Sequence, residues 1–138
     1  MYPLLEYALD PELVARIIDQ SVEVLPPEDG ILYRQGEPPD NLYFVKCGEV
    51  MIMLAADQKD VVFRVGAGSL IGIAAVVNNQ PYAMTAKAAS DAKLFKLSAE
   101  RFNELFTKDR NMQQAVLQIL AAEVRAARQA LSNYASDR

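Results

Sequence analysis

The residues whose types and spacing could do chemistry are concentrated between Gly66 and Asp91. This stretch has glycines at 66, 68 and 72, then a short apolar segment and an Asn-Asn-Gln-Pro turn at 78–81. Glycines let the backbone approach a ligand closely, and main-chain amides at the start of a helix attract anions. Most glycine loops are only tight turns, so the pattern by itself is a weak signal. The stretch is nevertheless the candidate binding site, and capture of a phosphate is the chemistry it indicates.

Other kinds of chemistry are poorly supplied. The 138 residues include no histidine and one cysteine, Cys47. A zinc site, a His-ligated haem, an iron–sulfur cluster and catalysis by Ser–His or Cys–His pairs are therefore not expected. The single cysteine rules out an internal disulfide and fits a reducing cytoplasm. We expect a protein that is not an enzyme and that has no metal or cofactor.

The candidate site resembles the phosphate-binding cassette of cyclic-nucleotide-binding domains. In that family a Gly-Glu-Leu-Ala run is followed, at the same spacing, by Pro-Arg-Ala-Ala-Thr. The matching runs here are GIAA at 72–75 and PYAMT at 81–85, without a gap. The glycines at 30, 36 and 48 also fall where the family keeps structural glycines, at corners that require positive φ or no Cβ. The resemblance covers about residues 22–134 and implies a β-roll.

The resemblance also implies which side chains would hold a cyclic nucleotide, and these are missing. The family's phosphate-binding arginine corresponds to Tyr82, and its ribose-binding glutamate corresponds to Ile73. The small hydroxyl residue after the arginine is Ala83, and the base-contacting Thr-Ser pair of bacterial regulators aligns with Ala127 and Arg128. Removing one partner of a buried charge pair costs about 3–5 kcal/mol. We therefore expect cyclic AMP to bind at least about a hundredfold more weakly than in the family.

The pocket that this leaves is apolar with one hydroxyl group. Its predicted lining is Gly72, Ile73, Ala74, Val76, Tyr82, Ala83 and Met84. Tyr82 and Met84 could fill the pocket themselves. It could also accept a small apolar or aromatic ligand oriented by the Tyr82 hydroxyl, or bind a cyclic nucleotide weakly. Arg64, at the end of the preceding strand, is the candidate substitute cation, whereas Lys87 has the wrong strand parity.

The elements that position this site follow from hydrophobic periodicity. Residues 1–20 are predicted to be helical, with Asp10 as N-cap and Pro11 at the first helical position. Short strands with regular turns then occupy residues 21–97, which favours an antiparallel β-roll, or double-stranded jelly-roll. Helices are predicted over 98–134, the first capped by Ser98 and the second starting at Asp109. The fold class is therefore mainly β with flanking helices, in one domain over 1–138.

The long C-terminal helix has a heptad stripe. Its members step by four and three residues, at Leu120, Val124, Ala127, Leu131 and Tyr134. This stripe either forms a dimer seam or lies on the roll. A second stripe, through Met112, Val116 and Ile119, is available for the roll, which favours the seam. In the family this helix is also the dimerisation helix, so we predict a homodimer.

Charge and hydropathy limit the partners. The net charge is −4 and the pI about 4.8, which opposes binding to nucleic acid. No apolar run is long enough for a membrane span, and no basic N-terminal region indicates a signal peptide. We expect a cytoplasmic regulatory or sensor domain with a degenerate cassette that binds cyclic AMP poorly. The alternatives are a structural or protein-interaction module with a self-filled pocket, and the effector domain of a transcriptional regulator, whose helix-turn-helix domain would begin where this chain stops at Arg138.

Overall fold

The structure of the protein is a computed structural model that describes residues 4–5, 9–56 and 59–136. Helices and strands alternate with short turns over most of this length. In chain order the elements are β1 (Leu4–Leu5), α1 (Pro11–Asp19), β2 (Val22–Val24), β3 (Ile31–Tyr33), β4 (Asn41–Cys47), β5 (Val50–Ala56), β6 (Lys59–Val65), β7 (Leu70–Ile71), α2 (Ile73–Asn78), β8 (Thr85–Ala88), β9 (Lys93–Ser98), α3 (Ala99–Lys108) and α4 (Arg110–Ser136).

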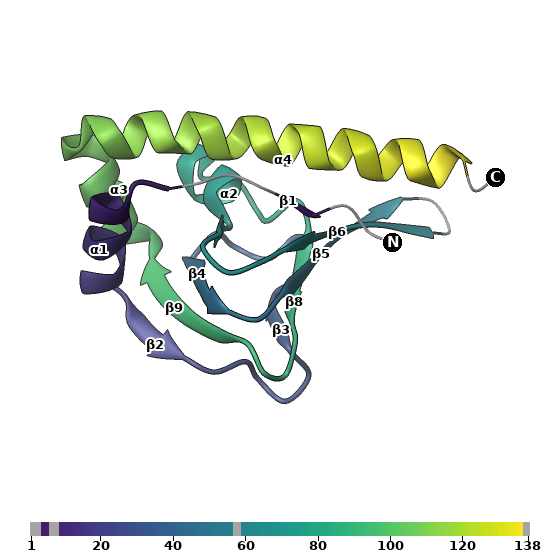
Figure 1. Ribbon diagram of the computed structural model, residues 1–138, viewed down its shortest axis with the longest axis horizontal. Helices are drawn as coiled ribbons and strands as arrows, with labels where there is room; N and C mark the ends of the chain where they lie inside the picture. The colour runs from purple at the N-terminus through teal and green to yellow at the C-terminus, as the bar shows by residue number, and fades with distance from the viewer. Residues whose placement is uncertain (1–3, 6–8, 57–58, 137–138) are drawn as a thin grey trace.

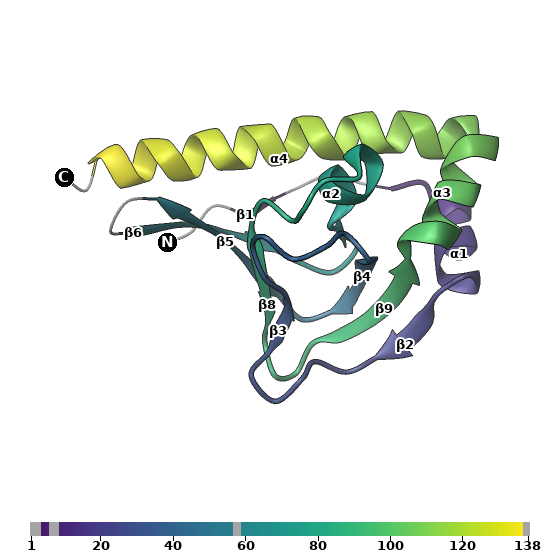
Figure 2. The same cartoon turned by 180° about the vertical axis from the view of Figure 1, so that it is seen from behind.

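The strands form two sheets that fold into a β-roll. One sheet has the order β1-β6-β5-β8-β3, and the other has the order β2-β9-β4-β7. All described pairings are antiparallel except that of β1 with β6. The long helix α4 runs along one side of the roll, and α1 and α3 lie at one end of it (Figure 1). The view from behind shows the same arrangement (Figure 2).

The predicted fold class is confirmed, and the main errors lie at the N-terminus and beside the candidate site. Helix α1 begins at Pro11 as predicted, but Leu4 and Leu5 form a strand, so the prediction of a helical segment over 1–20 is wrong. A strand of two residues is too short to show a hydrophobic period, and its partner strand lies far away in the sequence. The short strand β7 was also missed, and the apolar segment after it folds as α2. The strands from β2 to β9 lie between Val22 and Ser98, in agreement with the predicted range 21–97 to within one residue.

The hydrophobic core has two parts. The first, which we call the roll core, lies between the sheets and is formed mainly by β-strand residues such as Val45, Ile52 and Phe63. The second, the helix core, lies where the helices pack on β4 and β9; it contains Leu13 of α1 and Phe102 of α3. The candidate site lies where these two parts meet.

Both C-terminal helices begin as predicted. The Ser98 hydroxyl accepts a hydrogen bond from the Arg101 backbone N–H, and Asp109 accepts bonds from the N–H groups of Asn111 and Met112. These bonds satisfy amides that would otherwise lack partners at a helix start. Within α4, the predicted inner stripe through Met112, Val116 and Ile119 is buried in the helix core. That stripe fixes α4 against the domain.

Candidate functional site

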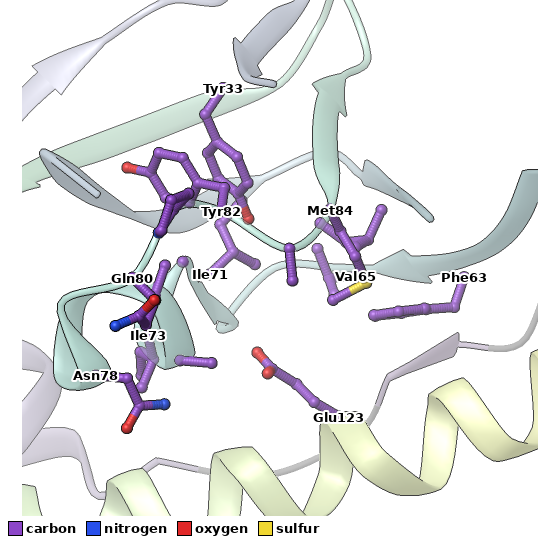
Figure 3. Close-up of a pocket in the computed structure, with 16 residues that line it drawn as sticks. Tyr33, Phe63, Val65, Ile71, Ile73, Asn78, Gln80, Tyr82, Met84 and Glu123 are labelled. Carbon is purple, nitrogen blue, oxygen red and sulfur yellow. The ribbon is translucent and has the colours of Figure 1, made fainter. Parts of the chain in front are cut away.

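A cavity of about 150 Å³ lies inside the roll, beneath α4. Its walls come from β3, β5, β6 and β7, from α2 and the loop that follows it, and from one position on α4 (Figure 3). The lining residues are Tyr33, Ile52, Phe63, Val65, Ile71, Gly72, Ile73, Ala74, Ala75, Asn78, Gln80, Pro81, Tyr82, Ala83, Met84 and Glu123.

Six of the seven residues predicted to line the pocket lie on this wall, and one does not. Gly72, Ile73, Ala74, Tyr82, Ala83 and Met84 line the cavity. Val76 packs instead in the helix core, so its placement in the pocket is wrong. Ile73 belongs to the same cluster, so α2 packs both residues in the helix core while Ile73 also lines the cavity.

The prediction of Arg64 as a substitute cation is also wrong for the cavity. Its neighbours in β6, Phe63 and Val65, both line the cavity, so strand alternation directs Arg64 to the opposite face. There the Arg64 guanidinium pairs with the Glu49 carboxylate at 2.8 Å. Lys87 is exposed, as its strand parity predicted. Neither basic residue reaches the site.

Tyr82 forms hydrogen bonds through its backbone and through its side-chain hydroxyl group. Its backbone N–H donates to the Glu37 carbonyl at 3.0 Å, and its own carbonyl accepts from the Gly36 N–H at 2.8 Å. The Tyr82 hydroxyl donates to the Asn41 carbonyl and accepts from the Asn41 N–H at 3.1 Å. Only 5% of the residue is exposed. The hydroxyl proton is committed to Asn41, so the hydroxyl has no free proton to donate to a ligand.

Gly72 lies so close to the Tyr82 ring and to the start of β4 that a side chain at this position would contact both. Gly72 has φ +91°, a conformation that side chains with a Cβ rarely adopt. A Cβ there would also lie 3.3 Å from the Asn41 carbonyl oxygen and 3.5 Å from the Tyr82 ring. The glycine therefore lets the cassette loop pass close to the start of β4, and the Tyr82 ring covers it.

A stack of tyrosines forms one end of the cavity. The rings of Tyr33 and Tyr82 lie 3.9 Å apart between centroids and are nearly parallel, at 16°. Burial, and then the negative charge of Glu123, raise the pKa of Tyr33. Burial also raises the pKa of Tyr82, against the opposing effect of its bond with Asn41. Both phenols therefore stay neutral at physiological pH.

Glu123 is the functional candidate that the sequence analysis missed. Figure 3 shows its side chain leaving α4 and pointing toward the other side chains that line the cavity. The residue keeps some outer surface, but burial of the carboxyl group raises its pKa to about 7. Among the described residues, the carboxyl group has no hydrogen-bond or ion-pair partner. Glu123 is half-buried and its oxygens are not among the fully buried side-chain atoms that lack a partner, so solvent still reaches the carboxyl group. Its place on an apolar wall still makes it a candidate functional group.

A sequence signal for Glu123 did exist. It lies four residues after Ile119 and seven after Val116, so helical spacing places it on the buried stripe of α4. The stripe continues with Ala126, which is also buried. An ionisable residue in a buried stripe is a warning that the helix faces a cavity or a partner.

The electrostatics of the cavity favour neutral or cationic groups. Among the residues that the structure describes, no lysine or arginine lines the cavity, and its one ionisable acid is Glu123. In a medium of low dielectric constant, a carboxylate repels an anion more strongly than it would in water. The same part of the chain holds no cluster of three or more potential metal ligands, and none of its helices has the length and hydropathy needed to cross a bilayer.

Comparison with known proteins agrees with the fold. A family model described as cyclic nucleotide-binding domain matches residues 25–109, which is more than half of the chain. A putative potassium channel protein of Rhodopseudomonas palustris is 29% identical over 90 residues, covering 65% of this chain. The catabolite activator protein of Thermus thermophilus superposes with a TM-score of 0.74 at 22% identity, over 95% of this chain. The c-di-GMP responsive regulator CLP of Xanthomonas campestris gives 0.73 at 21% identity, over 92%.

This chain spans only part of each of these proteins. It covers 22% of the channel protein, 62% of the Thermus protein and 63% of the Xanthomonas regulator. At these identities the two superpositions establish the fold alone. The match to the family model is independent of them and covers both the glycine corners and the candidate cassette.

Proposed function

Because the chain belongs to the cyclic nucleotide-binding domain family, we propose that it is a non-catalytic regulatory domain that senses a small ligand other than a cyclic nucleotide. The observation that carries this proposal is the combination of Tyr82 and Glu123 in one cavity. Tyr82 stands where the resemblance places the family's phosphate-binding arginine, and Glu123 adds a negative charge to a wall whose described residues include no lysine or arginine. A cyclic monophosphate would enter this cavity with its charge uncompensated.

The energies support this direction. Loss of the buried arginine partner alone weakens binding by about 3–5 kcal/mol, or roughly a hundredfold to several thousandfold. Repulsion by an ionised Glu123 acts in the same sense. The cavity of about 150 Å³ matches the size at which an engineered apolar cavity accepts benzene, and a purine nucleotide is far larger. That space remains after Tyr82 and Met84 are in place, which favours a sensor over a module with a filled pocket.

We further propose that α4 pairs with α4 of a second copy. Leu117, Val124 and Leu131 are seven residues apart, and 69%, 51% and 47% of their surfaces are exposed. The predicted members Leu120 and Ala127 lie between them at heptad spacing and are half-buried, and Leu120 also packs against the helix core. Leu117 adds one member to the N-terminal end of the predicted seam. The predicted member Tyr134 has a side chain outside the described part of the structure. Burying these apolar side chains would stabilise a homodimer.

The site and the seam share a helix, which suggests how sensing would work. Glu123 faces the cavity, and its neighbour Val124 belongs to the seam. A ligand that bound one position of α4 more strongly than another would shift the helix and therefore the pairing of two copies. Among the described residues that line the cavity there is no nucleophile–base pair, which supports a regulatory role over an enzymatic one.

Isothermal titration calorimetry with cyclic AMP and cyclic GMP tests the proposal. At ligand concentrations up to about 1 mM we expect no saturable heat from the folded chain, because the cavity does not compensate the charge of the phosphate. A dissociation constant of about 1 mM, the upper limit of this titration, corresponds to about 4 kcal/mol of binding free energy. A cooperative thermal transition of the same sample is the control for folding. Saturable binding of either nucleotide in the micromolar range would contradict the proposed function.

A further inference from the structure

The carboxyl group of Glu123 is the feature that the fold does not explain. Among the described residues it has no partner, it lies on the otherwise buried stripe of α4, and it points into an apolar cavity (Figure 3). We propose that Glu123 is a recognition residue for a protonated amine carried by a small, one-ring apolar ligand. This inference rests on the proposed function, in which the cavity takes a ligand other than a cyclic nucleotide.

The walls of the cavity select the apolar part of such a ligand. Phe63, Val65, Ile71 and Met84 line it with hydrocarbon and a thioether, and its volume of about 150 Å³ suits a single six-membered ring. Apolar walls bind a ring through the surface that both remove from water. Asn78 and Gln80 line the cavity from exposed positions, so a path from solvent exists beside α2.

The charge of the cavity selects the polar part. The titratable groups that face Glu123 from the other elements of the wall are the phenols of Tyr33 and Tyr82. Tyr82 is committed to Asn41, and both phenols are neutral at physiological pH. An ammonium group is therefore the partner that would neutralise Glu123, through a charge-assisted hydrogen bond. The aromatic faces of the same wall also attract cations.

The protonation state of Glu123 gives a second, independent test of the proposal, because it makes the affinity for an amine depend on pH. In the free protein burial raises its pKa to about 7, so the carboxyl group is largely protonated at pH 6. An ammonium ligand binds the ionised form and therefore displaces that proton. Its affinity should rise by up to about tenfold from pH 6 to pH 8. The affinity of a neutral ligand of the same shape should not rise over this range.

Three probes of similar shape test the inference: 2-phenylethylamine, 2-phenylethanol and 3-phenylpropionate, titrated by calorimetry. We expect the amine to bind at least about tenfold more tightly than the alcohol at pH 8, and the carboxylate to bind least. In Glu123→Gln the preference for the amine should disappear while binding of the alcohol remains. Glu104→Gln, which changes an exposed glutamate on α3, is the matched control and should behave as the wild type.

The outcomes separate this inference from the proposed function. If the alcohol binds as tightly as the amine, or if Glu123→Gln keeps the preference, the ligand class is wrong while a ligand-accepting cavity stands. If none of the three probes binds, both the ligand class and the sensing cavity are wrong. The pH dependence of the wild type needs no variant, so an affinity for the amine that stays constant between pH 6 and pH 8 overturns the inference even if Glu123→Gln fails to fold.

Discussion

Replacing Glu123 with glutamine should stabilise the protein, and by an amount that depends on pH. Glutamine has nearly the same shape as a protonated glutamate but cannot ionise. The carboxyl group titrates at about 7 in the folded chain and has a reference value of 4.5 when it is not perturbed by burial. Each tenfold difference in proton affinity between the folded and unfolded states is worth about 1.4 kcal/mol. The full difference therefore corresponds to roughly 3 kcal/mol.

The sign follows from which state binds the proton more tightly. Between about pH 4.5 and pH 7 the folded chain keeps the proton on Glu123, whereas the unfolded chain has lost it. The contribution of Glu123 to stability is therefore fully present below about pH 4.5 and is lost as the pH rises through about 7. Glu123→Gln lacks this loss. Its free energy of unfolding should approach that of the wild type below about pH 4.5 and exceed it by up to roughly 3 kcal/mol at pH 8.

Urea unfolding at several pH values between 5 and 8, at one chain concentration, measures this difference. Both proteins contain the same other titrating groups, so those contributions cancel in the comparison. Glu104→Gln, at an exposed position on α3, should differ from the wild type by a constant amount across the range. A difference between wild type and Glu123→Gln that does not change with pH, or a less stable variant at pH 8, would refute the assignment of a buried, unpaired carboxyl group.

Two further predictions concern the tyrosine in the cassette and the seam on α4. Tyr82→Phe should lower the free energy of unfolding by about 1–3 kcal/mol, because the Asn41 N–H and carbonyl groups lose their partner; Tyr43→Phe, which breaks a bond of 3.4 Å, should cost under about 1 kcal/mol in the same urea assay. Equal costs would show that the hydroxyl of Tyr82 does not brace the loop. Val124→Asp should convert a dimer to monomers in sedimentation velocity, whereas Gln118→Asp, exposed on another face of the helix, should not; an unchanged sedimentation coefficient for both would place the dimer contact elsewhere or nowhere.

Local patterns in the sequence were enough to predict most of the fold. The strands alternate in hydropathy, and the corners at Gly30, Gly36 and Gly48 all have positive φ. The cap at Ser98 and the start of a helix at Asp109 were equally visible, because helix starts depend on short-range chemistry. The β1 strand could not be found in this way, since two residues gain a partner only through a strand some sixty residues away.

The candidate site shows where local reasoning stops. Strand parity correctly predicted that Lys87 does not face the cavity. The same rule also excludes Arg64 from the cavity, because its neighbours Phe63 and Val65 are apolar and line it. Tyr82 was placed on the wall, but the use of its hydroxyl depends on Asn41, forty-one residues earlier. Glu123 lay in a visible stripe, yet only the packing of α4 over the cavity makes it part of the site.

The four hydrogen bonds of Tyr82 have a consequence for how this sequence could change. Two segments that belong to different parts of the roll, the turn at Gly36 and Glu37 and the beginning of β4, are already joined by this one side chain and its backbone. An arginine introduced there would keep the backbone bonds but release Asn41, while its positive charge would lie in the same cavity as the Glu123 carboxyl group. Tyr82→Arg would therefore add a cation to the cassette at the expense of the bonds that now hold the beginning of β4.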